Sequence, residues 1–220
     1  MLVAADGQLK AGKHGKAIAV DGLRAAILRG DMVPGQRLLE PELVGLFGVT
    51  RGSVRSAIDD LVAEGMVERI HNRGARVRKV SVQQAVEIME CRRALEALIA
   101  AKAAERAGAD DVAQLRAQGE LLSSAVRNGE AAKYSTLNQE LHGMIWRIAD
   151  QSTAAGLIGR LNAQIVRHQF RLAQREGWTN GSLVQHLGII DAIASGDPAA
   201  AEHAMHEHLS SVIDALRQTA

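Results

Sequence analysis

The sequence predicts a mainly helical protein with two domains: a small N-terminal domain containing one β-hairpin, and a larger C-terminal domain built from helices alone. Aromatic residues make up only 2% of the 220 residues, whereas strand-rich cores depend on aromatic and β-branched side chains. Apolar residues recur at helical spacing along most of the chain, and glycine or proline punctuates these runs. The single cysteine, Cys91, excludes an internal disulfide and a cysteine-based zinc finger.

Composition also indicates where the protein works. Hydrophobic residues account for 47% and charged residues for 23% of the chain, a balance typical of soluble globular proteins. No apolar run approaches the roughly 20 residues that a transmembrane helix needs. The N-terminus also lacks the charged-then-apolar order of a secretory signal. We therefore expect a soluble, cytoplasmic protein.

The first half of the N-terminal domain is expected to consist of two helices. Residues 1–12 are small and polar and predict a flexible tail, so the domain is expected to occupy residues 13–79. Apolar residues at helical spacing predict a helix over 16–29, and Pro34-Gly35 marks the turn that follows it. A short second helix, with apolar residues over 43–46, is expected to end at Gly48.

A third helix and a hairpin complete this domain. Thr50 predicts the N-cap of the third helix, which is expected to end at Gly65 and to carry Val54, Ile58, Leu61 and Val62 on one apolar face. Residues 66–70 alternate as a short strand, and 75–79 are expected to return as its partner after a turn at Asn72-Arg73-Gly74. The order helix, helix, tight turn, helix, hairpin is that of a winged helix-turn-helix.

The distribution of charge favours a polyanionic partner for this domain. Residues 13–80 carry a net charge of +4 and residues 81–220 a net charge of −3. Two stretches, 48–57 and 69–79, contain basic residues and no acid, and they fall on the third helix and on the hairpin. Ordinary surface charge is the alternative, and a net charge of +4 alone does not decide between them.

The third helix carries residue types suited to reading DNA. Arg51 and Arg55 are four residues apart and share a helix face, and an arginine fork pairs with guanine O6 and N7 in the major groove. Hydroxyl groups at its start suit phosphate or base contacts, and the glycine of the hairpin tip allows close approach to a groove. The complete set of candidate DNA-contacting residues is Arg37, Thr50, Arg51, Ser53, Arg55, Asn72, Arg73 and Gly74.

These residues carry a family resemblance. The stretch 17–79 resembles the DNA-binding domain of GntR-family transcription regulators, through PGQRL at 34–38, GVTRGSVRSAIDDLVAEGMVER at 48–69 and NRGARV at 72–77. The resemblance implies a DNA-binding regulator, and members of this family mostly repress promoters. The chain departs from some relatives after PGQRL, where LEPEL stands at a place that holds a DNA-contacting arginine in them.

Residues 80–220 predict a bundle of about six helices, in which the histidines are unevenly placed. His142, His186 and His208 each lie between inward-facing residues of their own helix, whereas His203 and His206 point away from the apolar stripe. His168 is a fourth inward candidate, whose role the sequence does not decide.

A single inward histidine is usually a hydrogen-bonded core residue. Three on three helices of one bundle suggest instead a site for a divalent metal, with Asn138 as an oxygen ligand one turn from His142. Zinc is the first candidate, and nickel and manganese are alternatives.

The C-terminal domain carries a second resemblance. It is similar to the FCD effector domain of the FadR-type branch of the GntR family, through CRRALEALIAAKAAERA at 91–107, LNQELHGMI at 137–145 and QHLGIIDAIASGDPAAAEHAMHEHL at 185–209. The resemblance implies a metal held by an Asp-x3-His pair and two further histidines, which fall on Asn138, His142, His186 and His208. Asparagine replaces the usual aspartate here, which removes one negative charge from the site.

Arg92 is the candidate residue for binding an effector. It lies inward between Met89 and Leu95, and its two alternative roles are an ion pair with an acid such as Glu96 or an anchor for an anionic ligand. Members of the family sense small carboxylates that a metal and an arginine hold, so we favour the effector role.

The sequence therefore predicts a ligand-responsive regulator, in which a small organic acid at a metal site changes the affinity for a short palindromic operator. A homodimer is expected, because a two-fold protein doubles its contacts on a two-fold site. One alternative is a metal-dependent enzyme in which the histidine cluster activates water. Another is a helical interaction module without small-molecule control.

Overall fold

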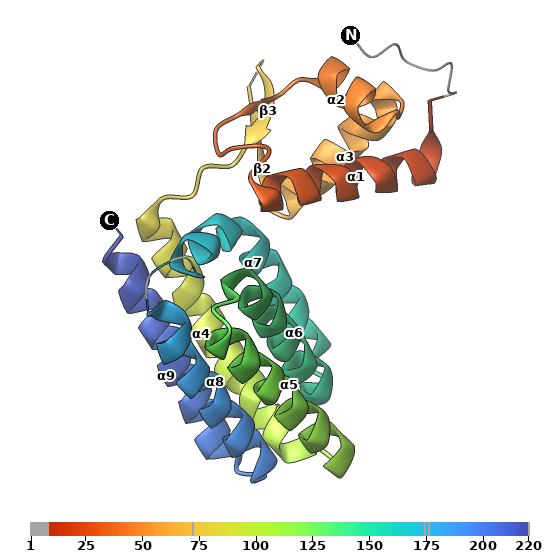
Figure 1. The fold of residues 1–220 in the computed structure, drawn as a ribbon. Coiled ribbons are helices and arrows are strands. Elements are labelled where there is room, and N and C mark those ends of the chain that lie inside the picture. The colour runs from red at the N-terminus through yellow and green to blue at the C-terminus, as the bar shows by residue number, and fades with distance from the viewer. Residues whose placement is uncertain (1–8, 72, 174, 176, 220) are drawn as a thin grey trace. The chain divides into compact units, whose positions relative to one another are not determined.

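The computed structural model describes residues 9–71, 73–173, 175 and 177–219. The chain divides into two compact units, Met1–Val80 and Ser81–Ala220, which we call the winged unit and the helical unit. The winged unit combines helices with a small sheet, and the described part of the helical unit contains helices alone (Figure 1). The predicted fold class, mainly helical with an N-terminal winged helix-turn-helix, is therefore confirmed.

The winged unit has the predicted order of elements with one addition. A two-residue strand precedes the second helix, where the sequence offered only a turn, because so short a segment has no periodicity to recognise. Within the described residues the elements are α1 (Gly12–Arg29), β1 (Arg37–Leu38), α2 (Glu40–Phe47), α3 (Arg51–Ala63), β2 (Val67–Ile70) and β3 (Gly74–Val77).

The small sheet is antiparallel and has the order β1-β3-β2. The predicted hairpin is present, with Val67 opposite Val77 and Ile70 opposite Gly74. The additional strand β1 pairs with the other edge of β3, with Arg37 opposite Arg76. Because β3 is central, the sheet ties the wing to the segment that leads into α2.

The core of the winged unit lies between α1 and α3. Leu23 of α1 and Val54, Ile58 and Leu61 of α3 are at most 2% exposed, so the predicted apolar face of the third helix is buried. The turn between α2 and α3 depends on Gly48, whose φ of 62° is a conformation that glycine adopts without strain. Burial of one face leaves the opposite face of α3 open to solvent.

Residues 10–12 differ from the expected flexible tail. The amide of Lys10 donates to the carbonyl of Gly48 at 3.0 Å, and the carbonyl of Lys10 accepts from the amide of Thr50 at 3.0 Å. Helix α1 already begins at Gly12. The segment therefore braces the start of α3, a long-range pairing that local composition does not reveal.

The helical unit contains six helices in its described part, as predicted. Ser81 caps the first of them in a capping box with Gln84. The helices are α4 (Val82–Arg106), α5 (Ala109–Arg127), α6 (Ala131–Ala149), α7 (Ser152–Ala173), α8 (Trp178–Ala194) and α9 (Pro198–Arg217).

Helix α4 is the centre of this bundle. It packs along α9 and also contacts α6, α7 and α8, while α5 packs against α6 and α8 (Figure 1). Met89 and Ile99 of α4, Leu141 and Ile145 of α6 and Met205 of α9 have no exposed surface. Polar side chains of α4, α6, α8 and α9 that face inward are thereby brought into one interior.

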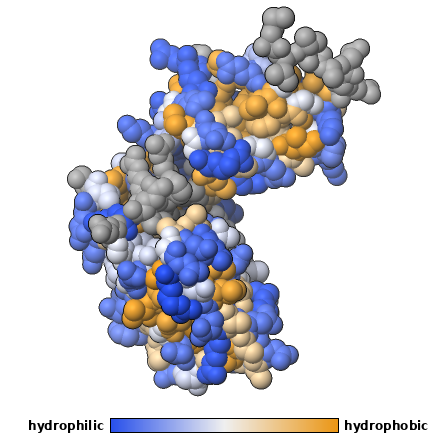
Figure 2. All heavy atoms as spheres, viewed as in Figure 1, coloured by the Kyte–Doolittle hydropathy of each residue, from blue (hydrophilic) through white to orange (hydrophobic). Residues whose placement is uncertain are grey.

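The surfaces of both units are mixed. Figure 2 shows apolar side chains at the visible face of each unit with polar side chains around them. Among the described helices, none combines the length and the apolarity that crossing a bilayer requires.

Candidate nucleic-acid interface and candidate metal centre

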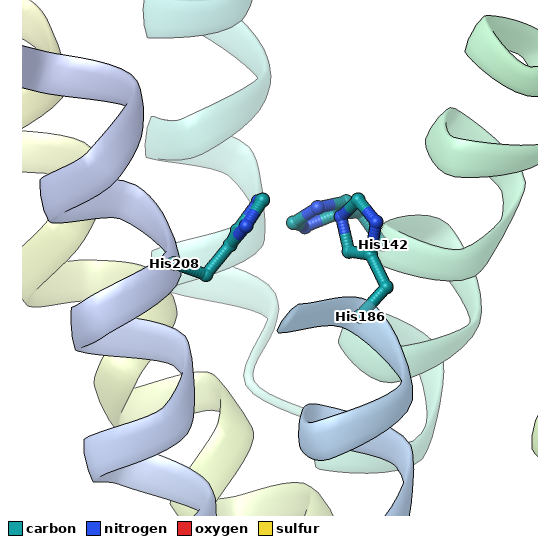
Figure 3. A group of neighbouring side chains, drawn as sticks. All are labelled: His142, His186 and His208. Atoms are coloured by element: carbon teal, nitrogen blue, oxygen red, sulfur yellow. The ribbon is translucent and has the colours of Figure 1, made fainter. Parts of the chain in front are cut away.

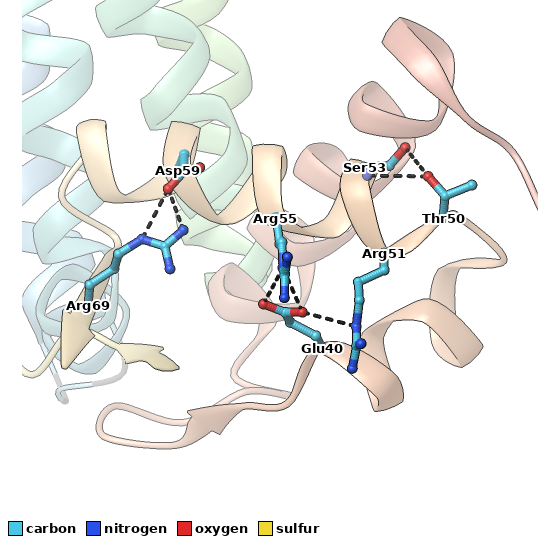
Figure 4. A network of polar contacts seen from close by, with 7 residues as sticks. All are labelled: Glu40, Thr50, Arg51, Ser53, Arg55, Asp59 and Arg69. Carbon is cyan, nitrogen blue, oxygen red and sulfur yellow. Dashed lines mark hydrogen bonds and ion pairs between the residues drawn. The ribbon is translucent and has the colours of Figure 1, made fainter. Parts of the chain in front are cut away.

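The start of α3 is held by a hydroxyl cap. Thr50 Oγ1 accepts a hydrogen bond from the amide of Ser53 at 3.3 Å and lies 3.0 Å from Ser53 Oγ (Figure 4). Thr50 is therefore the N-cap that the sequence predicts. Ser53 is only 4% exposed, which corrects its assignment to DNA: its hydroxyl belongs to the cap and is not presented to a partner.

Arg51 and Arg55 occupy one exposed face of α3, as their spacing predicts. Their side chains are 61% and 60% exposed, and both contact Glu40 of α2. Arg55 Nε donates to both carboxylate oxygens of Glu40, at 2.9 and 3.0 Å, and Arg51 Nε lies 3.2 Å from one of them (Figure 4). The two guanidiniums are thus brought together at the surface by one carboxylate.

The wing places further basic residues at the surface. Arg73 and Gly74 are exposed at the tip, where Gly74 has a φ of 83°. Arg37 is exposed on β1, and within the described residues neither Arg37 nor Arg73 makes an ion pair. Asn72, which we also expected to contact DNA, lies outside the described residues.

Two other arginines of the wing are paired with acids. Arg69 Nε donates to Asp59 of α3 at 3.1 Å (Figure 4). Arg76 pairs with Glu68 of the neighbouring strand at 2.5 Å. These pairs reduce the charge along the flank of the wing. The start of α3, where two arginines share one carboxylate, and the wing tip, with Arg73, each keep a net positive charge.

In the helical unit, three histidines from three helices converge. His142 of α6, His186 of α8 and His208 of α9 are 8%, 0% and 4% exposed (Figure 3). One ring nitrogen of each lies within 4.8 Å of the others, close enough to hold a metal ion together. The prediction that these three histidines face inward is confirmed, and His203 and His206 are exposed as expected.

Each of the three rings has its Nδ1 engaged by a second residue. His142 Nδ1 lies 2.7 Å from Glu96 Oε2, and His208 Nδ1 lies 3.0 Å from Gln185 Oε1. Because carboxylate and amide oxygens only accept, both Nδ1 atoms carry the proton, which leaves the Nε2 lone pair of a neutral ring for a metal.

His186 completes the set through a tyrosine. Its Nδ1 lies 2.9 Å from the hydroxyl of Tyr134 and 3.4 Å from that of Ser182. Burial raises the pKa of Tyr134 to about 12, so this hydroxyl stays protonated. All three rings are therefore oriented by a contact at Nδ1.

Two of the rings, His186 and His208, are neutral because they are buried. Burial lowers the pKa of His186 to about 3. Burial also lowers the pKa of His208 well below its ordinary value, with His186 and His142 adding to the effect. A neutral imidazole is the form that ligates a divalent metal.

Unpartnered polar atoms lie in the same region. Within the described residues, the buried side-chain nitrogen and oxygen atoms without a hydrogen bond are Asn138 Oδ1, Trp146 Nε1 and His186 Nε2. Such an atom costs roughly 1–3 kcal/mol unless something satisfies it. Asn138 and Trp146 are each one turn from His142 along α6, so the orphaned acceptor and donor flank the centre. The donor set fits a cation with a ligand beside it.

Arg92 adopts the alternative role that the sequence left open. Its Nε donates to Glu96 Oε1 at 2.9 Å, its Nη2 pairs with the same oxygen, and its Nη1 lies 3.3 Å from the sulfur of Met89. Arg92 is 4% exposed and Glu96 0%. The guanidinium is thus neutralised by a carboxylate, and any contact with an effector falls to Nη1.

Sequence reasoning did not predict Glu96, Tyr134 or Gln185 as residues of this site. Burial raises the pKa of Glu96, but the charges of Arg92 and His142 and their hydrogen bonds outweigh this and hold the pKa below its ordinary value. Glu96 therefore remains a carboxylate in the core and connects Arg92 to His142. Its position one turn after Arg92 was the available signal.

The fourth candidate histidine lies apart from this group. His168 is half-buried on α7, and the three-histidine group of the described chain does not include it.

Two family models match the chain. The model described as bacterial regulatory proteins, gntR family, matches residues 17–77, and the FCD domain model matches residues 87–211. The first covers the helices and the wing, and the second covers the region that holds the histidine centre.

Related proteins span nearly the whole chain. The HTH-type transcriptional repressor RspR of Escherichia coli K12 is 29% identical over 197 residues, which cover 87% of this chain and 86% of RspR. The HTH-type transcriptional repressor GlaR of the same strain is 26% identical over 204 residues, covering 89% and 93%.

Solved structures show the same fold. E. coli McbR/YncC superimposes with a TM-score of 0.78 at 21% identity, covering 93% of this chain and 97% of that one. A GntR protein from Rhodococcus sp. RHA1 gives a TM-score of 0.74 at 23% identity, covering 94% and 100%.

Proposed function

This chain belongs to the gntR family of bacterial regulatory proteins and carries an FCD domain, and we propose that it is a repressor whose operator affinity changes when a small organic acid binds the helical unit. It is a DNA-binding transcription regulator and not an enzyme, which removes the water-activating metalloenzyme that the histidine cluster alone left open. Repression is supported by relatives named as repressors. The proposed location is the cytoplasm, beside the DNA.

On the DNA side, we assign base reading to Arg51 and Arg55. Their exposure and their shared face at the start of α3 support this, because the N-terminal part of a recognition helix contacts base edges in the major groove. Arg37, Thr50, Arg73 and Gly74 are assigned to the backbone and to the groove beside the wing. A homodimer on a short palindrome would double these contacts, and a mass measurement at micromolar concentration tests it.

On the effector side, we assign a divalent metal to Asn138, His142, His186 and His208. The observation that carries this assignment is that every Nδ1 in the cluster is already engaged while His186 Nε2 and Asn138 Oδ1 have no partner. Zinc suits this nitrogen-rich set, and nickel and manganese remain candidates. The metal, when bound, supplies a positive charge that a carboxylate can ligate.

Charge balance favours an acid as effector. Three neutral imidazoles and a neutral amide leave the charge of the ion uncompensated. The carboxylate of Glu96 does not compensate it, because both of its oxygens already bind Arg92 and His142. An anion relieves this imbalance where a neutral sugar or an amine does not. The unpartnered Trp146 N–H and Arg92 Nη1 are the additional donors that we assign to the acid.

Regulation requires the acid to prefer one arrangement of the DNA-binding units. A coupling of about 1–3 kcal/mol would change operator affinity by roughly 5- to 150-fold. The test is binding to a duplex that the wild-type protein selects from a random library, titrated with lactate, pyruvate and succinate, with and without chelator. A neutral matched probe is succinamide. If no acid shifts the curve of metal-loaded protein, or succinamide does so equally, the proposal fails.

Metal content provides the second arm of this test. His186→Ala is expected to lose bound metal after dialysis, whereas His203→Ala, an exposed histidine in the same unit, is expected to retain it. Equal metal content in the two variants would contradict the assigned site.

A further inference from the structure

One acidic residue lies inside the cationic surface of the winged unit. Glu40, in the first turn of α2, has a side chain that is only 25% exposed, whereas the two arginines that it contacts are 61% and 60% exposed. Figure 4 shows its carboxylate directed at the guanidiniums of Arg51 and Arg55. An acid at this position weakens the attraction of the winged unit to any polyanion. Its presence therefore cannot be explained by a gain in affinity for DNA.

The contacts of Glu40 are confined to one edge of each guanidinium. Arg55 donates to it through Nε, at 2.9 and 3.0 Å, and Arg51 approaches it through Nε at 3.2 Å. The Nη groups of both arginines thus stay outside this contact. A planar guanidinium held along its Nε edge can rotate little, and its remaining N–H groups point in a set direction.

The net charge of this group also favours base contacts over phosphate contacts. The two arginines and Glu40 together carry a net charge of +1 in place of +2, which reduces attraction to phosphate on any sequence. The N–H donors that recognise guanine O6 and N7 are retained. In addition, α3 has no acid in its first turn, so Arg51 faces the positive end of the helix dipole and gains from a carboxylate nearby.

We propose that Glu40 is a positioning residue that sets the sequence specificity of this regulator, by holding Arg51 and Arg55 as a pair directed at bases and away from phosphates. This inference rests on the proposed function, in which these two arginines read DNA. It concerns how the free protein is prepared for a specific site: the arginines are oriented before DNA arrives, and Glu40 remains in place when DNA is bound.

A different role for Glu40 predicts the opposite behaviour. If the carboxylate only imitated a phosphate and left on binding, its removal would strengthen binding to all DNA alike. If it positions the arginines, its removal weakens binding to the selected sequence while strengthening binding to other sequences. The ratio of the two affinities therefore distinguishes the two roles.

The experiment compares Glu40→Gln with Glu42→Gln. Glu42 lies in the same turn of α2, is exposed and makes no ion pair within the described residues, so its substitution removes the same charge without the arginine contact. Affinities are measured by fluorescence anisotropy for the duplex selected by the wild type and for a scrambled duplex of equal composition, at two salt concentrations. Thermal unfolding confirms that the variants fold.

For Glu40→Gln, we expect affinity for the scrambled duplex to rise about two- to fivefold, with a salt dependence steeper by about one phosphate contact. We expect affinity for the selected duplex to fall about fivefold or more, as when one bidentate base contact is lost. Glu42→Gln should change both affinities by one common factor. A common factor in Glu40→Gln as well would overturn the inference.

The variants Arg51→Ala and Arg55→Ala show whether a negative result for Glu40→Gln contradicts only the role of Glu40 or also the proposed base reading by α3. If they lower the specificity ratio while Glu40→Gln does not, the arginines read bases without Glu40, and only the present inference fails. If none of the three variants lowers the ratio, base reading by α3 fails and the role of Glu40 fails with it.

Discussion

Each of the two units contains a glutamate that contacts two nitrogen-bearing side chains, but at very different depths. In the winged unit, Glu40 holds Arg51 and Arg55, whose side chains are 61% and 60% exposed. In the helical unit, Glu96 holds Arg92 and His142, and these side chains are 5% and 10% exposed. Similar chemistry thus occurs once in water and once in a core.

Depth decides what the contact is able to do. An exposed ion pair contributes about 0–1 kcal/mol to folding stability, because water and salt screen it, so it can orient its arginines without being needed for the fold. Removing one member of a buried pair leaves an uncompensated charge and costs about 3–5 kcal/mol. The surface contact therefore leaves cationic donors available to a polyanion, while the buried contact orients a histidine of the metal centre.

The largest expected effect tests the buried contact. Glu96→Ala leaves the Arg92 guanidinium buried without its carboxylate, and we expect the helical unit to lose about 3–5 kcal/mol of unfolding free energy. Both tryptophans, Trp146 and Trp178, belong to this unit, so tryptophan fluorescence during denaturant titration reports on it alone. A loss below 1 kcal/mol would remove the distinction between the two contacts.

The next largest effect concerns the exposed contact of Glu40 with Arg51 and Arg55, and it is measured by DNA binding. Arg51→Ala and Arg55→Ala are each expected to cost about 1–3 kcal/mol of discrimination between the selected duplex and a scrambled one. Because both side chains are exposed, thermal stability should change little, as judged by circular dichroism. Loss of stability without loss of discrimination would show that these arginines serve the fold.

A third prediction extends the comparison to another buried partner. Tyr134→Phe removes the hydroxyl at 2.9 Å from His186 Nδ1, and we expect metal affinity to fall about 10- to 100-fold. Thr136→Val changes a hydroxyl on the same helix that bonds the carbonyl of Ala132, and it should leave affinity unchanged. Equal effects in a competition titration with a chromogenic chelator would show that Tyr134 does not orient the ligand.

The smallest effect concerns a second exposed pair. Asp59→Ala removes the partner of Arg69, and because the two side chains are 61% and 48% exposed we expect a change of at most about 1 kcal/mol in stability. The freed arginine should also bind a scrambled duplex slightly more tightly. A destabilisation as large as that of Glu96→Ala, measured by thermal unfolding, would contradict the rule drawn from burial.

Much of the helical architecture and part of the site could be predicted from the sequence. Apolar periodicity placed Val54, Ile58 and Leu61 on the buried face of α3, and Thr50 was recognised as its cap. The same periodicity turned His142, His186 and His208 inward. These are local properties, because a residue's face on a helix depends only on its neighbours within one or two turns.

Other features were decided by tertiary structure. Strand β1, the pairing of Lys10 with the start of α3, and the contact of Glu40 with Arg51 and Arg55 all join segments that are distant in the chain or too short to show a period. Ser53 was assigned to DNA from its type and place, but packing buries it.

The sequence by itself determined that six C-terminal helices would form, and that three histidines would face their common interior. Only the tertiary structure decided that the three rings meet, that Glu96, Tyr134 and Gln185 each take one Nδ1, and that Arg92 is committed to Glu96. The physical reason is that the face of a helix follows from bonded geometry and local burial. The partner across an interior depends on the packing of all the helices at once, which no single stretch of sequence specifies.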